Sequence, residues 1–444
     1  MTQKINRRTF AKTSAAVAVS LSALETTRAL GANDRVRVGF MGVANRGGQL
    51  IKAFLENKDV DIVALCDVAR STLGSANARL GGKAATYGDF RKMLERRDID
   101  AVVIATPDHW HALQTIAACR SGKDVYVEKP LSVTVHEGRK MVEVARETQR
   151  IVQVGLHRRS SRLFADAAKL FIADGIGKIT VSRCYQLSNM YPTGIGKAAP
   201  SAPPADLDWD MWLGPRAARP FQATIAPYKF RWWMPYSSQI ANNGVHFLDA
   251  IRWMTGDEAP SRICALGGRF AVDDDRTIPD TMEATFETPS GRLVVFGQYE
   301  ANGNPAMAQP GWCELRGTQG TAYVSESTVQ IVPEKGGQFQ DHKLRMKPLE
   351  MKASGVATDK RGNANLSLTA LHARNFLDCM RSRELPHCDV EIGHRSTSYA
   401  LLANIALLTR KCLEWDAKAE QFVHCDEANQ LLHYEYRKPW RLDG

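Results

Sequence analysis

The sequence lacks several features that would place it in a familiar class of protein. Its nine cysteines form no CxxC pair, and no two of them lie closer than nine positions, which argues against a structural zinc site or a thioredoxin-type redox pair. We find no internal repeat. After residue 32, no apolar run approaches the roughly 20 residues that a membrane-spanning helix needs. We therefore expect no metal site and no membrane span in the mature chain.

The excess of positive over negative charge is also small. The chain has 58 basic and 48 acidic residues, and part of the net charge of +10 lies in the first 32 residues. Because so small an excess is spread over a long chain, we expect no nucleic-acid partner. What is present is an ordinary globular composition, 44% hydrophobic and 24% charged, over 444 residues. That length predicts at least two domains, and we expect the cysteines to be small, buried and unpaired.

The first 32 residues have the features of a targeting segment. Asn6-Arg7-Arg8-Thr9-Phe10-Ala11-Lys12 precedes a short apolar stretch, and small residues lead to Ala32. This order predicts a secretion signal peptide over residues 1–32. The paired arginines before Phe and Lys resemble the twin-arginine export signal. The resemblance implies a bacterial protein exported after folding, to a periplasmic or extracellular location.

A glycine turn follows the first predicted strand. The text from Arg35 reads as a short apolar strand, a turn at Gly42-x-Ala44-x-x-Gly47 and a helix start that includes Asn45 and Arg46. Such a turn lets the backbone approach a pyrophosphate. A second strand ends at Asp67, 20 residues after Gly47, where an acid can bind the ribose hydroxyls. An acid there favours NAD over NADP, although Arg70 nearby leaves room for NADP.

Strands and helices then alternate as far as residue 154, which predicts a doubly wound parallel sheet with its ligands at the carboxyl ends of the strands. Those ends carry the following candidate residues: Thr106, Pro107 and His111; Glu128 and Lys129; and His157 and Arg158.

Glu128-Lys129-Pro130 after a strand resembles a motif of the Gfo/Idh/MocA oxidoreductases, and the resemblance covers the chain from Arg35 onward. It implies an NAD-binding Rossmann domain over residues 33–158. A C-terminal α+β domain over residues 159–444 would then carry an open, mostly antiparallel sheet that binds substrate and supports a homo-oligomer, a dimer or tetramer. The resemblance also implies that Lys129 lies beside the nicotinamide and the substrate hydroxyl, where a lysine of lowered pKa can take the hydroxyl proton.

A second family signature pairs an acid with a histidine one helical turn later. The matching residues are Asn242 and His246, and their spacing of four predicts that a helix start aims both into one cleft. His246 suits general acid/base work near neutral pH. Asn242 stands where the sugar dehydrogenases usually carry Asp, and an amide can bind a hydroxyl but cannot accept its proton. Asp249 is expected to orient His246 or to cap structure.

One exported branch of the family is still more similar, the branch that includes glycoside hydrolase family 109, whose members are NAD-dependent α-N-acetylgalactosaminidases. Asn242 before Gly-x-His-x-x-Asp and the upstream Phe230-Arg231-Trp232-Trp233 carry this resemblance. It places Tyr228 and Arg231 on a loop that faces the cleft. The chain departs from the hydrolases at Phe247, where they have a second histidine, and at residues 236–240, where they have a glycine-rich stretch.

Three functions remain open. The leading one is hydride transfer between a ring carbinol of a sugar or glycoside and tightly bound NAD. The first alternative is net glycoside hydrolysis, in which a transient C3 ketone acidifies C2, the C1 group is eliminated, water adds and hydride returns. It needs a second acid/base group, for which Tyr228, His157 and Tyr236 are candidates. The second alternative is a non-catalytic sugar-binding relative.

The remaining predictions concern packing. Trp209, Trp212, Trp232 and Trp233 are expected to form a packed loop core rather than a sugar platform. His109 and His111 point differently on a helix and are not expected to share a metal. We predict strands over residues 179–187, 262–270, 282–287, 292–298 and 312–315, helices over 368–382 and 396–413, and a polar excursion or dimer arm over 335–362.

Overall fold

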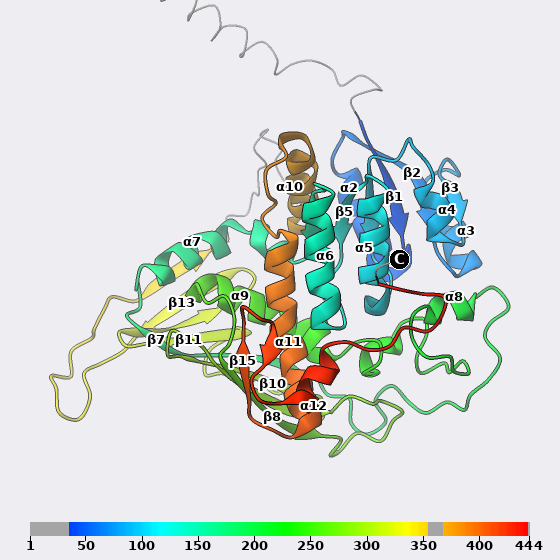
Figure 1. The fold of residues 1–444 in the computed structure, drawn as a ribbon. Coiled ribbons are helices and arrows are strands. Elements are labelled where there is room, and N and C mark those ends of the chain that lie inside the picture. The colour runs from blue at the N-terminus through cyan, green and yellow to red at the C-terminus, as the bar shows by residue number, and fades with distance from the viewer. Residues whose placement is uncertain (1–34, 354–366, 443–444) are drawn as a thin grey trace, which may run out of the picture.

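The computed structural model describes residues 35–353 and 367–442 (Figure 1). The predicted signal peptide of residues 1–32 lies outside the described residues, as do residues 354–366 of the polar excursion. Within the described ranges, no helix is long and apolar enough to cross a membrane.

The N-terminal sheet is parallel and has six strands in the order β3-β2-β1-β4-β5-β6. The order reverses beside β1, and such a switch point is where a doubly wound sheet opens a ligand crevice. The strands are β1 (Val36–Met41), β2 (Val60–Cys66), β3 (Ala85–Tyr87), β4 (Ala101–Ile104), β5 (Asp124–Val127) and β6 (Val152–Val154). The helices are α2 (Asn45–Leu55), α3 (Arg70–Arg79), α4 (Phe90–Leu94), α5 (His111–Arg120) and α6 (Val135–Glu147).

Apolar side chains on both faces hold this sheet between its helices. Strands β4 and β5 are buried along their whole length, as expected for central parallel strands. One face packs on α2 through Leu50 and Phe54, and the other on α5 and α6 through Ile116 and Met141. Helix α6 begins at a capping box in which Thr134 and Glu137 each bind the other's backbone N–H.

The C-terminal sheet is larger and mostly antiparallel, with β10 and β7 as its parallel pair. Together the two sheets confirm the predicted fold class. The ten strands are β7 (Ile179–Leu187), β8 (Arg262–Gly268), β9 (Thr281–Glu287), β10 (Leu293–Tyr299), β11 (Cys313–Gly317), β12 (Gly320–Val324), β13 (Thr328–Pro333), β14 (Leu349–Lys352), β15 (Leu413–Asp416) and β16 (Gln421–Phe422).

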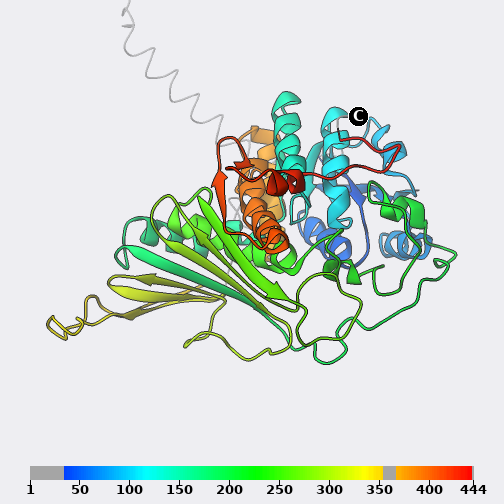
Figure 2. The same cartoon turned by 60° about the horizontal axis from the view of Figure 1, so that its bottom comes forward.

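Helices cover one face of this sheet and leave the other face open (Figure 2). Helix α11 lies beside α6 of the Rossmann domain and also packs on the larger sheet, so it joins the two halves (Figure 1). The helices of this half are α7 (Arg162–Ile172), α8 (Trp209–Leu213), α9 (Val245–Thr255), α10 (Leu368–Ser382), α11 (Val390–Thr409) and α12 (Asp426–Asn429).

Two irregular segments return from the C-terminal half to the Rossmann domain. The first, residues 188–236, carries α8 and packs around a core that includes Trp209, Trp212 and Trp233, as predicted for these tryptophans. We call it the cover loop. The second, residues 433–442, follows α12, crosses to α8 and ends beside α5 (Figure 1). We call it the C-terminal tail.

Three predictions were wrong in detail. Helix α11 begins at Val390 and not at residue 396, because the Asp389 side chain caps the N–H of Glu391. It ends at Thr409, since Arg410 adopts a left-handed conformation. Two cysteines are paired, in a disulfide between Cys264 of β8 and Cys412. The polar excursion contains the short edge strand β14.

Candidate active site

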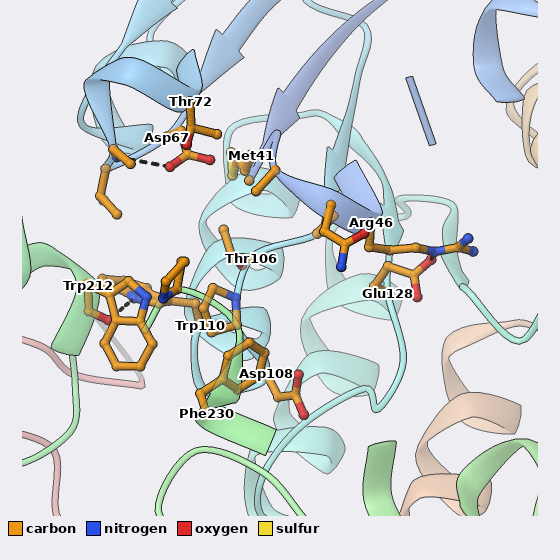
Figure 3. A pocket seen from close by; sticks show the side chains of 18 of the residues that line it. Met41, Arg46, Asp67, Thr72, Thr106, Asp108, Trp110, Glu128, Trp212 and Phe230 are labelled. Carbon is orange, nitrogen blue, oxygen red and sulfur yellow. Dashed lines mark hydrogen bonds and ion pairs between the residues drawn. The ribbon is translucent and has the colours of Figure 1, made fainter. Parts of the chain in front are cut away.

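A cavity of about 300 Å³ opens at the carboxyl ends of β1, β2, β4 and β5 and is closed from the other side by the cover loop. Figure 3 shows part of its wall. Of the predicted site residues, the structure brings together Gly42, Ala44, Asn45, Arg46, Asp67, Thr106, Pro107, His111, Glu128, Lys129, Tyr228, Arg231 and Asn242.

The glycine turn allows a ligand to approach the backbone closely. Gly42 has a φ of +78°, and a Cβ there would lie 2.6 Å from the carbonyl oxygen of Ala105. Gly47 packs directly against the Gly42 carbonyl, so a side chain would separate α2 from the turn. Gly47 therefore supports the cavity from behind. The methyl group of Ala44, in the position of the second glycine, faces the cavity without blocking it.

Asp67 follows β2 at the edge of the same cavity. Its two carboxylate oxygens accept hydrogen bonds from the backbone N–H of Val43, at 2.9 Å, and of Ala69, at 3.0 Å (Figure 3). Burial raises the pKa of Asp67, and these backbone donors act against that rise. The neighbouring Arg70 turns to the carbonyl oxygen of Ala205, at 2.6 Å, and does not line the cavity.

A charged pair lies at the middle of the wall. Arg46 Nε donates to Glu128 Oε1 at 2.8 Å, and the pair links the start of α2 to the end of β5 (Figure 3). His111 ties two strand ends together, because its ring nitrogens lie 2.8 Å from the Pro130 carbonyl oxygen and 2.9 Å from that of Thr106. These contacts hold Lys129 in place next to Glu128.

Lys129 is a half-buried cation of the site. Its Nζ donates to the backbone carbonyl oxygen of Asn242 at 2.7 Å, which joins the Rossmann domain to the C-terminal half. Burial lowers the pKa of Lys129 to about 8, aided by the charges of Arg231 and Arg46 and opposed by those of Glu128 and Asp108. A substantial fraction of this lysine is therefore neutral at mildly alkaline pH and able to accept a proton.

Asp108, which lies in the strand-end segment 106–111 but was not predicted as a site residue, also lines the cavity. Asp108 follows β4, is 4% exposed and accepts a hydrogen bond from the Ser237 hydroxyl. Burial raises the pKa of its carboxyl group, while the charges of His111, Lys129 and Arg231 lower it. The rule that selected Thr106 and His111, proximity to a strand end, applies equally to Asp108. The sequence gives no sign of its partner Ser237, which lies 129 residues away.

The cover loop supplies the opposite wall. The Arg231 guanidinium stacks on the Tyr228 ring, 3.9 Å from its centroid, and Tyr228 remains 46% exposed. Phe230 lies beside Asp108 in the cavity (Figure 3). The cover loop therefore gives the cavity wall both polar groups and an apolar side chain. This combination suits a ligand ring that carries several hydroxyl groups.

The structure does not bring His157, Arg158 or His246 to the cavity wall. His246 lies in the first turn of α9, its ring centroid 5.4 Å from that of His157. Asn242 belongs to a π-helical turn, Ile240–Gly244, and lines the cavity, whereas His246 follows in the first turn of α9 and does not, so the two do not have the register of one regular α-helix that the spacing assumed. Burial lowers the pKa of His157 to about 3 and that of His246 well below its usual value. Both rings are therefore neutral at pH 7.

Other candidates have structural roles. Asp249 pairs with Arg159 at 2.8 Å and accepts from Ser396, so it does not orient His246. Tyr236 is 1% exposed and packs on Trp212, outside the cavity. His109 binds the Trp212 carbonyl oxygen. Among the described residues, no group of three His, Cys, Asp or Glu side chains could hold a metal ion.

The cavity has what a dinucleotide requires. A glycine turn meets the start of α2, an acid lies at the end of β2, and the crevice lies at the switch point of the sheet. Gly42, Ala44, Asn45 and Arg46 would hold the pyrophosphate side and Asp67 the adenosine ribose. Lys129 and Glu128 line the same cavity, directly after β5.

Comparison with known proteins agrees with this geometry. The model described as "Oxidoreductase family, NAD-binding Rossmann fold" matches residues 36–156. Two C-terminal models of the same family match residues 215–323 and 357–442, and the three together take in more than half of the chain. A glycosyl hydrolase family 109 protein of Shewanella sp. (strain W3-18-1) is 33% identical over 174 residues, which are 33% of this chain and 38% of the relative.

Solved structures share the fold over nearly their whole length. A levoglucosan dehydrogenase in complex with NADH and L-sorbose has a TM-score of 0.65 and 16% identity over 86% of this chain and 99% of its own. The scyllo-inositol dehydrogenase of Lactobacillus casei, with NAD(H) and scyllo-inositol, has a TM-score of 0.58 and 18% identity over 86% and 99%. The matched models, in chain order, and the site geometry lead to one conclusion: the chain belongs to the Gfo/Idh/MocA oxidoreductase family.

Proposed function

We propose that this protein transfers hydride between a ring carbinol of a sugar or glycoside and tightly bound NAD. The observation that carries the proposal is that one cavity contains both the dinucleotide determinants, Gly42 and Asp67, and a half-buried lysine with a pKa of about 8, Lys129. A non-catalytic sugar-binding relative would gain nothing from burying an ammonium group at the reacting end. Solved relatives titled as sugar and inositol dehydrogenases support the substrate class.

Lys129 is the proposed base. Its Nζ is fixed by the Asn242 carbonyl oxygen, and it takes the proton of the substrate hydroxyl as the carbon–hydrogen bond of the same carbon is broken. The bound nicotinamide supplies the hydride acceptor. Asp67 favours NAD over NADP, because its carboxylate would repel a 2′-phosphate and Arg70 is turned away from the cavity.

The proposed substrate contacts come from both halves. Tyr228, Arg231 and the Asn242 side chain line the cavity and can bind hydroxyl groups. Next to it lie buried nitrogens that have no hydrogen-bond partner within the described ranges: His157 Nδ1, His246 Nδ1, and Nε and Nη1 of Arg158. Such groups cost free energy unless a ligand or water meets them, so they are candidates to receive the far side of the sugar.

Net glycoside hydrolysis or lyase chemistry is the second candidate. Two observations favour it: the curated relatives named as family 109 glycosyl hydrolases, and a cover loop that closes over the cofactor cavity. A cofactor enclosed in this way can be regenerated within each turnover, which an exported enzyme without a supply of NAD requires.

The test is an assay of the purified mature protein against a panel of nitrophenyl glycosides. Phenol release and reduced-nicotinamide absorbance are followed together, with and without added NAD⁺. Stoichiometric reduced cofactor with an intact glycoside supports the dehydrogenase. Phenol release without lasting reduced cofactor, with deuterium from heavy water entering C2, supports the hydrolase. If neither signal appears and Lys129→Ala changes nothing, the proposal is wrong.

Two further proposals concern location and assembly. The twin-arginine motif supports export to the periplasm or beyond, which fractionation of the producing bacterium tests. The open face of the larger sheet exposes Leu266, Leu293 and, just past β8, Phe270, which supports a homo-oligomer formed through that face. Light scattering on a size-exclusion column would measure the number of copies.

A further inference from the structure

We propose that Asp108 is the second acid/base residue of the site and that it protonates the leaving glycosidic oxygen, with Ser237 as its positioning residue. The inference rests on the proposed function and deepens it. The substrates it implies are glycosides whose leaving group needs a proton, such as alkyl glycosides and oligosaccharides. The reaction is then the elimination route rather than simple dehydrogenation.

The position of Asp108 is the first argument. It lies in the short turn Asp108–Trp110 at the end of β4, next in the sheet to β5, which ends before Lys129. Both residues line the same cavity, yet no ion pair joins their side chains within the described part of the chain. Asp108 and Lys129 can therefore serve two different atoms of one substrate.

The surroundings of the carboxyl group are the second argument. The Ser237 hydroxyl donates to Oδ2, and no described residue donates a hydrogen bond to Oδ1. Phe230 lines the same cavity and gives it an apolar wall (Figure 3). A carboxyl group that is 4% exposed has its pKa raised by burial, as a proton donor at neutral pH requires.

The three candidates from the sequence are less suitable. Tyr236 is packed among aromatic rings away from the cavity. His157 has its pKa lowered to about 3 and lies off the cavity wall. Tyr228 lines the cavity but is 46% exposed, so water competes with it for the leaving oxygen. Two buried carboxyl groups, Asp108 and Glu128, share the cavity with Lys129, but Glu128 is paired with Arg46.

The proposed step balances as follows. A ketone at C3, made by the proposed function, acidifies the C2–H bond, and a base takes that proton. The electron pair forms the C1=C2 double bond as the C1–O bond breaks, and the Asp108 proton moves to the departing oxygen. Water then adds to C1 and gives its proton to the Asp108 carboxylate, while C2 regains a proton. Asp108 ends in its starting state.

The experiment compares Asp108→Asn with the wild-type holoenzyme on methyl and nitrophenyl glycosides of one sugar. We expect cleavage of the methyl glycoside to fall by about 100-fold or more, the usual effect of removing a general acid. Cleavage of the nitrophenyl glycoside should fall far less, because nitrophenolate leaves without a proton. The variant should also accumulate reduced-nicotinamide absorbance on the methyl glycoside, since oxidation proceeds and elimination stalls.

Ser237→Ala tests the positioning role. It should lower methyl glycoside cleavage several-fold, leave the KM nearly unchanged and shift the pH dependence of that cleavage. Glu137→Gln is the matched control, because Glu137 is also a fully buried carboxyl that accepts from a hydroxyl, that of Tyr436, but lies outside the cavity. It should leave the methyl-to-nitrophenyl rate ratio as in the wild type.

The outcomes separate the two proposals. Equal loss of both glycosides in Asp108→Asn, or loss of the oxidation signal while cofactor content and melting temperature are retained, overturns the role of Asp108. A wild-type enzyme that oxidises sugars and cleaves no glycoside also overturns it and leaves the oxidoreductase proposal standing. A wild-type enzyme that does neither overturns the proposed function itself.

Discussion

At the scale of single residues, the lowered pKa of Lys129 predicts how oxidation depends on pH. Below about pH 8 the ammonium form dominates and cannot accept a proton, so the rate of cofactor reduction should rise about tenfold per pH unit and level off above pH 8. Stopped-flow absorbance at a series of pH values measures this. Lys129→Met should lower the rate by about 100-fold or more and remove the pH-dependent limb. A profile unchanged in the variant would contradict the assignment.

A second residue-scale prediction concerns Asp67 and the choice of cofactor. The wild-type protein should bind NAD in preference to NADP. Asp67→Asn should reduce that preference by about tenfold or more, since a charge-assisted hydrogen bond contributes about 1.5–3 kcal/mol and the carboxylate no longer repels a 2′-phosphate. Calorimetry with both dinucleotides measures it. Asp61→Asn is the control, because Asp61 also lies in the β2 segment but pairs with Arg35 on the surface. Equal binding of both cofactors by the wild type would exclude NAD selectivity.

The residues of the site were predictable where a local rule applies. The sequence shows a glycine turn, which led to Gly42, and an acid 20 residues after that turn, which led to Asp67. Lys129 was found from its place at a strand end and from the motif resemblance. Contacts between distant segments were not visible, and this explains the omission of the Asp108–Ser237 pair. The prediction that Asn242 and His246 both face the cavity assumed a regular α-helix, and the π-helical turn Ile240–Gly244 that precedes α9 could not be read from the sequence.

At the scale of elements, the cover loop predicts a slow release of cofactor. Residues 205–208 lie along residues 68–71, directly after Asp67: the Arg70 N–H donates to the Asp206 carbonyl oxygen at 2.9 Å, and the Asp208 N–H to that of Val68 at 3.0 Å. The Asp206 carboxylate also accepts from the Ser71 hydroxyl. Asp206→Ala should therefore speed the loss of bound NAD several-fold.

Fluorescence of bound NADH during dilution measures that release. Asp273→Ala is the control, since Asp273 pairs with Lys197 on the cover loop but outside the cavity wall. An unchanged release rate in Asp206→Ala would mean that this contact does not retain the cofactor.

Elements were predictable to different degrees. The predicted strand 179–187 and helix 368–382 coincide with β7 and α10, because their apolar periodicity is regular. Helix α11 was placed six residues late at its start, since its first two turns carry the polar residues Glu391 and His394, which pair with Arg139 of α6 and with Glu420. Strands β12 and β13 were missed because neither has a long enough run of alternating residues. Strand β12 forms by pairing with β11, and β13 by pairing with β12.

At the scale of the whole molecule, the C-terminal tail joins regions that are distant in sequence. Trp440 packs on Trp110, with ring centroids 4.8 Å apart, and on Phe90, and both of these line the cavity. Trp440→Ala should lower the free energy of unfolding by about 2 kcal/mol and weaken NAD binding, because aromatic contacts and partly buried area are lost. Urea titration and calorimetry measure both effects.

The control for the tail is Phe339→Ala, whose side chain is 91% exposed. It should change neither quantity. If Trp440→Ala lowers stability and leaves NAD binding intact, the tail holds the fold together without shaping the cofactor site.

The disulfide provides a test of the proposed export of the protein. Cys264 and Cys412 are 148 residues apart in sequence, and their bond ties β8 to the segment that enters β15. Disulfides form in oxidising compartments, so protein recovered after export should carry this bond, and leaderless protein from the cytoplasm should not. Cys264→Ser with Cys412→Ser should lower the free energy of unfolding of exported protein by about 2–4 kcal/mol. Cys425→Ser, which removes a free half-buried thiol, is the control. Thiol titration that finds all nine cysteines free in exported protein would contradict both the bond and this argument for export.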